Sequence, residues 1–244
     1  MRLTIVNPNT SASFCKLIES QLIPLAAPGT LLRVVSPPTG FPAIEGFRDE
    51  AYASAGVCGV VEREQENGSE GYLIACFGDT GLFAAREIAS GPVVGMTEAA
   101  IQAASTLAER FAIVTLPSRT RAHSMRVLAH LGMTHRCSVQ TIDVSVGALE
   151  DEAEAAYPAL LTSSQRAVDE DGAEAIILGC AGMAKLATPL SDRLGLPVID
   201  GVGIGFKMLE GLIVCGLRTS KASTFGPPTK HGVAVPLLTQ GPHL

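Results

Sequence analysis

The chain has 244 residues, of which 47% are apolar and 17% are charged, and it carries a net charge of −6. This length suits one large α/β domain or two domains of about 120 residues, and the apolar fraction is ample for a core. The acidic balance, the lack of Trp and an aromatic content of 5% exclude a nucleic-acid surface, and no uninterrupted apolar stretch reaches the about 18 residues of a membrane span.

Short apolar runs alternate along the chain with stretches of helical periodicity. The runs predict strands at residues 3–6, 31–35, 71–76, 92–95, 111–115, 139–144, 175–178 and 198–199. The periodic stretches predict helices at residues 12–25, 49–67, 96–109, 118–131, 150–171 and 203–214. Pro158 is expected to bend or split the helix at 150–171. The tail from residue 218 has few periodic positions, so it is expected to pack on the surface or against another subunit.

This alternation predicts a mostly parallel sheet flanked by helices. Ligands of such folds bind beyond the carboxyl ends of the strands. Five segments fall at predicted strand ends, namely residues 7–11, 36–46, 76–81, 115–118 and 180–183. We expect them to converge on one pocket, with the Pro- and Gly-rich segment 36–46 as a wall.

Two of the six cysteines, Cys76 and Cys180, occupy matched settings. Each follows a short apolar run, opens into a Gly-containing turn and precedes a Pro-led strand by 16 or 17 residues. The match predicts two related α/β halves whose equivalent loops meet at a cleft. A thiol beside a helix N-terminus favours the thiolate, so the pair could remove a proton from one face of a carbon and return it on the other.

Several of these residues also have a purely structural interpretation. Buried cysteine is often a small apolar residue, which is the interpretation we prefer for Cys15, Cys58, Cys137 and Cys215. Asn9 could simply cap the first helix. Asp79 could cap the helix that follows it, leaving only its N–H for function.

Four motifs together resemble the hydantoin and allantoin racemases of the aspartate/glutamate racemase superfamily. They are the sequences at residues 7–11 (NPNTS), 44–46 (IEG), 76–79 (CFGD) and 179–183 (GCAGM). The resemblance runs from Met1 to about Thr219. It implies two Rossmann-like lobes related by a pseudo-twofold, each with a mostly parallel sheet of four to five strands. The active site would lie in the interlobe cleft, with lobe 1 formed by residues 1–95 plus about 201–244 and lobe 2 by residues 96–200.

The resemblance also separates branches of the superfamily. Glutamate and aspartate racemases typically place Asn-Thr and Thr-His after the two cysteines, where this chain has Phe77-Gly78 and Ala181-Gly182. These loops offer little side-chain charge, so a neutral ring bearing carbonyls suits them better than a zwitterion. Arylmalonate decarboxylases keep one cysteine of the pair, whereas maleate isomerases keep both and remain an alternative, as does an amino-acid racemase.

The resemblance implies a racemase that uses neither cofactor nor metal and acts on a cyclic ureide, either allantoin or another 5-substituted hydantoin. Cys76 and Cys180 would exchange the proton at C5 as thiolate base and thiol acid. Residues expected to bind the substrate are Asn9, Ile44, Thr115 and, through backbone N–H groups, Gly78, Asp79, Ala181 and Gly182. A helix N-terminus near each cysteine is expected to lower the thiol pKa.

The remaining expectations concern partners and location. A homo-oligomer is expected, without nucleic-acid or membrane partners. The first residues form a strand rather than a signal peptide, so the cytoplasm is expected, where cysteines stay reduced. Two other classes stay open: a redox protein that uses Cys76 and Cys180 as a dithiol, and a non-catalytic ligand-binding module.

Overall fold

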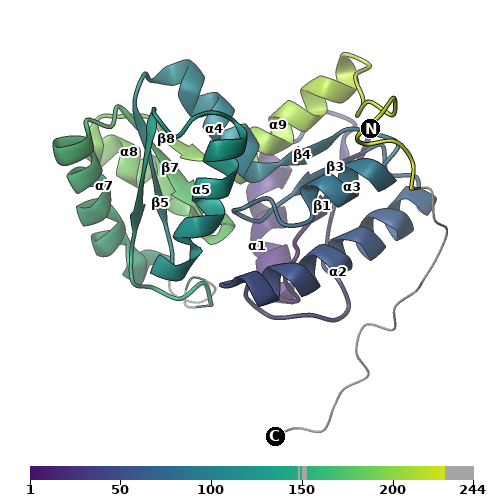
Figure 1. Cartoon of the computed structure of the whole chain (residues 1–244), viewed down its shortest axis with the longest axis horizontal. Coiled ribbons are helices and arrows are strands. Elements are labelled where there is room, and N and C mark those ends of the chain that lie inside the picture. The colour runs from purple at the N-terminus through teal and green to yellow at the C-terminus, as the bar shows by residue number, and fades with distance from the viewer. Residues whose placement is uncertain (148, 150–152, 229–244) are drawn as a thin grey trace, which may run out of the picture.

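The computed structural model describes residues 1–147, 149 and 153–228, and it contains two four-stranded sheets side by side (Figure 1). The first sheet has the order β2-β1-β3-β4, formed by β1 (Arg2–Val6), β2 (Leu31–Val35), β3 (Gly71–Ile74) and β4 (Val93–Gly95). The second has the order β6-β5-β7-β8, formed by β5 (Phe111–Thr115), β6 (Cys137–Thr141), β7 (Ala175–Gly179) and β8 (Val198–Asp200). All these pairings are parallel. The prediction of two related α/β lobes is confirmed, with four strands in each.

Helices cover both faces of each sheet. The first sheet lies between α1 (Ala12–Leu22) with α9 (Gly201–Val214) and α2 (Phe47–Glu66) with α3 (Leu82–Ile88). The second lies between α7 (Tyr157–Asp171) with α8 (Ala187–Leu194) and α4 (Met96–Leu107) with α5 (Arg121–His130). Short 3₁₀ turns join some of these elements, namely η1 (Ile23–Leu25), η2 (Ser118–Thr120), η3 (Ala153–Ala156) and η4 (Ala181–Leu186). Strands covered on both faces are apolar throughout, which is why the sequence shows them as continuous apolar runs.

Two helices exchange between the lobes. α4 follows β4 of the first sheet but packs on β7 and β8, whereas α9 follows β8 and packs on β3 and β4 (Figure 1). The two helices contact each other. A Cβ atom at Gly201 would lie 2.6 Å from the carbonyl oxygen of Met96, so only glycine lets α9 begin this close to α4. The lobe division at 1–95 plus about 201–244 and at 96–200 stays a proposal, and its residues 229–244 lie outside the described part of the chain.

Most element boundaries lie within about three residues of the predicted ones, and three of the differences have a clear physical reason. The sixth strand occupies 137–141 rather than 139–144 because Cys137 and Val139 face the core. The helix expected at 150–171 is split: η3 precedes α7, and Pro158 lies in the first turn of α7, where its missing N–H costs nothing. The expected start of that helix, at 150–152, lies outside the described residues. α9 begins at Gly201 because the Asp200 carboxylate accepts hydrogen bonds from Val202 N and Gly203 N.

The described part of the tail packs on the first lobe. The Lys221 ammonium donates to the carbonyl oxygens of Arg86 and Glu87 at the end of α3. Phe225 stacks on Phe83 of the same helix, with ring centroids 6.1 Å apart. The tail therefore caps the C-terminal end of α3.

Candidate active site between the lobes

The ends of four central strands meet at the boundary between the lobes. Val6 is level with Ile74 in the first sheet, and Thr115 is level with Gly179 in the second. The residues that follow these strands line one cavity of about 50 Å³, which receives side chains from both lobes. The cavity contains both matched cysteines, so the expected convergence of strand-end loops is observed.

Cys76 enters the cavity from the loop between β3 and α3. The Ala75 amide donates to Val6 O at 2.8 Å, which extends the β1–β3 pairing by one residue and fixes where the loop begins. The Cys76 sulfur lies 3.5 Å from the Thr80 hydroxyl oxygen and 3.8 Å from the carbonyl oxygen of Phe77. Thr80 is buried, so its hydroxyl is held against the thiol.

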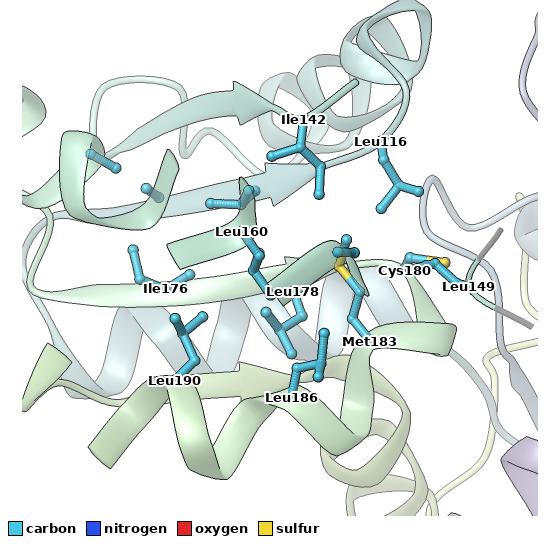
Figure 2. Packing of buried hydrophobic residues seen from close by; sticks show 14 of the residues in the cluster. Leu116, Ile142, Leu149, Leu160, Ile176, Leu178, Cys180, Met183, Leu186 and Leu190 are labelled. Carbon is cyan, nitrogen blue, oxygen red and sulfur yellow. The ribbon is translucent and has the colours of Figure 1, made fainter. Parts of the chain in front are cut away.

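Cys180 enters from the other lobe at the edge of an apolar cluster. Figure 2 shows its sulfur beside Leu149 and near Met183, at the end of the packed core of the second lobe. Cys180 has extended backbone and leads directly into η4. The backbone N–H of Gly182, two residues on, acts on the Cys180 thiol and lowers its pKa.

The thiol pKa values contradict the expected lowering by helix termini. Burial raises the pKa of Cys76 to about 12, against a lowering by the Thr80 hydroxyl. Burial likewise raises the pKa of Cys180 to about 11, against a lowering by the Gly182 amide. The helix effect is confined to the first turn, and α3 begins only at Leu82, six residues after Cys76. Each thiol is therefore neutral at pH 7 in this buried setting.

Asn7 and Asn9 lie side by side at the end of β1. The Asn7 Nδ2 atom donates to Asn9 Oδ1 at 2.8 Å and lies 3.2 Å from both Ser11 O and Ser36 Oγ. The Asn9 Oδ1 atom also accepts from Ser11 N at 2.9 Å. Helix α1 is capped by the Ser11 hydroxyl, which accepts from Phe14 N. Asn9 is therefore not the cap of that helix.

The structure brings six of the nine predicted site residues to the cavity, namely Asn9, Ile44, Cys76, Thr115, Cys180 and Ala181. Three others are not among its lining residues. The Gly78 amide donates to Thr97 Oγ1 at 2.8 Å, and the Asp79 amide donates to Cys76 O at 3.0 Å. The Gly182 amide lowers the pKa of the Cys180 thiol. The Gly78 and Asp79 amides thus already have intramolecular acceptors, and the role of these three amides in substrate binding stays a prediction.

Asp79 has a structural role other than the expected one. Its carboxylate accepts from Thr97 N at 2.8 Å and from Glu98 N at 2.9 Å, so it caps α4 rather than α3. Gly95 precedes α4, and a Cβ atom there would lie 2.4 Å from the Asp79 carboxyl carbon. Burial raises the pKa of Asp79 to about 7, against the lowering by these two amides. The Cys76 loop is thereby tied to the helix that crosses into the second lobe.

Eight further residues line the cavity that were not predicted as site residues, namely Asn7, Phe14, Ala75, Phe77, Leu116, Thr120, Val146 and Gly179. Asn7 and Phe77 belong to the motifs at residues 7–11 and 76–79, so the sequence could have indicated that they line the site. Thr120 Oγ1 lies 3.3 Å from Thr115 Oγ1 and within hydrogen-bond distance of Leu116 O and Pro117 O. Phe14 and Val146 reach the site only through packing between lobes, for which the local sequence carries no signal.

Contacts between lobes close the rim of the site. The Glu45 carboxylate accepts from Val146 N at 2.8 Å. Glu50 of α2 forms a salt bridge with Arg126 of α5, and its carboxylate lies 3.7 Å from Nε2 of His123. The segment between β2 and α2 is thus attached to the second lobe on both sides of Gly46.

A larger cavity lies behind the Cys76 loop. It has a volume of about 390 Å³ and is lined by residues of α2, α3 and α5, together with Gly78 and Asp79. Neither cysteine lines it. The reactive groups and the larger space are therefore on opposite sides of one loop.

Known proteins share both the sequence and this architecture. The model of the Asp/Glu/Hydantoin racemase family matches residues 3–209. A hydantoin racemase of Paenarthrobacter aurescens is 40% identical over 94% of this chain and 98% of its own length. One of Rhizobium meliloti is 41% identical over 93% of this chain and 95% of its own. The structure of an allantoin racemase from Klebsiella pneumoniae superposes with a TM-score of 0.92 at 43% identity, covering 96% of each chain.

These matches extend over nearly the whole chain and include both cysteine-bearing strand ends. The superposition on the allantoin racemase structure covers both lobes. The chain therefore belongs to the Asp/Glu/Hydantoin racemase family and is an isomerase of the racemase class.

Proposed function

We propose that this racemase interconverts the enantiomers of 5-substituted hydantoins, a class of cyclic ureide that includes allantoin, with Cys76 and Cys180 as the two acid–base groups. The observation that carries the proposal is that both thiols line one cavity between the lobes. Both cysteines are free, so each sulfur is available for proton transfer. The names of the similar hydantoin and allantoin racemases support the substrate class.

Proton exchange at C5 needs one thiolate and one thiol. The thiolate removes the C5 proton, a new S–H bond forms, and the electrons of the broken C–H bond move into the adjacent carbonyl as an enolate. The other thiol then protonates C5 on the opposite face and is left as the thiolate. The two cysteines have exchanged roles, and no cofactor takes part in the step.

The cavity lining favours a neutral ring over a zwitterion. Among the described residues that line it, none is charged, and the polar groups are Asn7, Asn9, Thr115, Thr120 and the two thiols. A substrate carboxylate would find no cation there, whereas the carbonyls and N–H groups of a ureide match amide and hydroxyl partners. The Ala181 amide, next to Cys180, is the remaining backbone donor of the predicted set.

Substrate entry requires this closed site to open. The cavity of about 50 Å³ is far below the roughly 300 Å³ of usual small-molecule pockets. We propose that segment 36–46 moves with α2 when the Glu45 contact to Val146 and the Glu50 contact to Arg126 break. Opening would also hydrate the thiols and so ease formation of the thiolate.

Optical rotation tests the function directly. Enantiopure allantoin and an enantiopure 5-alkylhydantoin are incubated in D₂O with the protein, and the spontaneous rate is subtracted. We expect rotation to decay to zero while deuterium enters C5, and the relative rates rank the two substrates. No enzyme-dependent decay with folded, reduced protein would refute the proposal.

We also propose that the protein is a cytoplasmic homo-oligomer. Six free thiols suit a reducing compartment, and in the described part of the chain no helix is long and apolar enough to cross a membrane. Exposed apolar side chains that could form a subunit interface include Ile23, Leu31, Val214 and Leu217. Sedimentation velocity at micromolar concentration should show an oligomer, and a monomer would contradict this part.

A further inference from the structure

The orientation of the Asn9 amide follows from its neighbours. The backbone nitrogen of Ser11 can only donate, so the Asn9 atom 2.9 Å from it is the oxygen Oδ1. That oxygen lies 2.8 Å from a side-chain atom of Asn7, which must therefore be a donor, Nδ2. The same Asn7 atom lies 3.2 Å from Ser11 O, which can only accept. The backbone thus fixes the orientation of both amides.

Each asparagine consequently has one free polar atom. Within the part of the chain that the structure describes, Asn9 Nδ2 and Asn7 Oδ1 make no hydrogen bond to another residue. Both residues are nearly buried, with 2% of Asn7 and 8% of Asn9 exposed, and both line the cavity with the cysteines. Neither free atom is among the fully covered polar atoms without a partner, and the cavity is the space that both residues line. A donor and an acceptor are presented there by neighbouring residues.

We infer that Asn7 and Asn9 together recognise the C4=O/N3–H edge of the ring, with Asn9 Nδ2 donating to the C4 oxygen and Asn7 Oδ1 accepting from N3–H. This rests on the proposed function. The C4 oxygen receives the enolate charge when the C5 proton leaves, so a fixed donor on it stabilises the transition state. Asn7 has a second role as a positioning residue, because its Nδ2 holds Asn9 Oδ1 away from the substrate. A carboxylate in the same place would meet Asn7 Oδ1 unfavourably, which excludes open-chain acids.

N-methylated substrates test the contact to N3–H. A 5-benzylhydantoin and its 1-methyl and 3-methyl derivatives are assayed with wild type, N7A and N9A, each rate being divided by the uncatalysed exchange rate of the same compound. With wild type, we expect the 3-methyl derivative to be racemised about tenfold or more less efficiently than the parent, and the 1-methyl derivative to serve as the matched control.

The variants then separate the two asparagines. In N7A the penalty for the 3-methyl derivative should disappear, because its partner is absent. In N9A the parent and the 3-methyl derivative should fall by the same factor. An unchanged 3-methyl penalty in N7A would overturn the assignment of Asn7, even if wild type racemises the parent. Failure of wild type on every hydantoin would instead refute the proposed function.

A second variant covers the case in which N7A does not fold. N9D keeps the oxygen that accepts from Ser11 N and Asn7 Nδ2 but replaces the free donor with an oxygen. We expect a melting temperature within a few degrees of wild type and a loss of racemisation of at least about a hundredfold. If N9D retained wild-type activity, the donor role of Asn9 would be wrong.

Discussion

The two cysteine loops begin alike and are supported differently. Both follow a central strand at the same level of its sheet, but Cys76 is followed by a loop of several residues, whereas Cys180 runs straight into η4. The pKa of the Cys76 thiol is lowered by a side-chain hydroxyl, that of Thr80, whereas the pKa of the Cys180 thiol is lowered by a backbone amide, that of Gly182. The Thr80 hydroxyl can be removed by a side-chain substitution, whereas the Gly182 backbone amide cannot.

The helix that follows each Pro-led strand shows the same contrast. α9 is capped by Asp200, the residue directly before it, whereas α4 follows Gly95 and is capped by Asp79 from the Cys76 loop. In the first half, the cap of the crossing helix and the position of the reactive cysteine therefore depend on one loop. In the second half they are separate. The comparison teaches that pseudo-symmetry of the fold does not extend to the groups that hold the thiols.

Replacing either thiol should have the largest effect. C76S and C180S should each lower racemisation by about 10³-fold, within the range for loss of a general acid or base. Each variant should still exchange the C5 hydrogen for deuterium without inversion in one enantiomer, and the two variants should differ in which one. Proton NMR in D₂O measures this, and C215S, at an exposed thiol outside the cavity, is the control. If both variants exchanged the C5 hydrogen of the same enantiomer, the two cysteines would not act on opposite faces of C5.

The pH dependence should be the next largest effect. The raised pKa values of Cys76, about 12, and Cys180, about 11, mean that the base form is scarce in the free enzyme at neutral pH. Because the thiolate is the active form, kcat/KM should rise about tenfold per pH unit from pH 7 to pH 9. Racemisation rates corrected for the spontaneous reaction at each pH measure this. A plateau already at pH 7 would show a stable thiolate in the resting enzyme.

The two helix caps should separate stability from activity. D79A and D200A should each lower the free energy of unfolding by about 1–2 kcal/mol, because each removes a carboxylate that accepts two amide N–H groups. Only D79A should also lower kcat/KM, since Asp79 anchors the Cys76 loop. Chemical denaturation and racemisation below the melting temperature measure the two effects. Equal kcat/KM in D79A and D200A would show that Asp79 does not hold the Cys76 loop in its active position.

The smallest expected effect is that of the Thr80 hydroxyl. T80V should raise the pKa of Cys76 further and lower kcat/KM by about fivefold, the equivalent of one hydrogen bond, whereas T80S should retain activity. Because the equilibrium constant of a racemisation is one, kcat/KM must fall equally in both directions. If the effect is on the thiol, kcat/KM should level off at a higher pH in T80V than in T80S, and the same levelling-off pH in both would place the effect elsewhere.

Local sequence patterns were sufficient for the architecture. Strands such as 111–115 and 175–179 are covered by helices on both faces, so they are apolar at every position. Such continuous apolar runs are easy to recognise in the sequence. The predicted sixth strand began two residues and ended three residues too late, because this strand lies at a sheet edge, where its pattern mixes Cys137, Val139 and polar residues. The two cysteines could be singled out because each is the first polar residue after such a run.

The support of the site could not be read in the same way. Asp79 contacts Thr97 and Glu98, which lie 18 and 19 residues further on, so its capped helix is set by packing and not by local spacing. Phe14 of α1 and Val146 line the cavity from different lobes. Such contacts depend on how the two sheets are oriented, which no single segment encodes.

The sequence alone determined the two α/β halves, the strand ends that carry Cys76 and Cys180, and the family. Only the tertiary structure decided the state of those thiols and the direction of the nearby polar groups. The physical reason is that helix periodicity and strand hydrophobicity depend on neighbouring residues in the sequence, whereas the desolvation of a side chain depends on all the segments that pack around it. The pKa of each cysteine rises because both lobes together exclude water from it, and Asn9 presents a donor because Asn7 and Ser11 N occupy its oxygen.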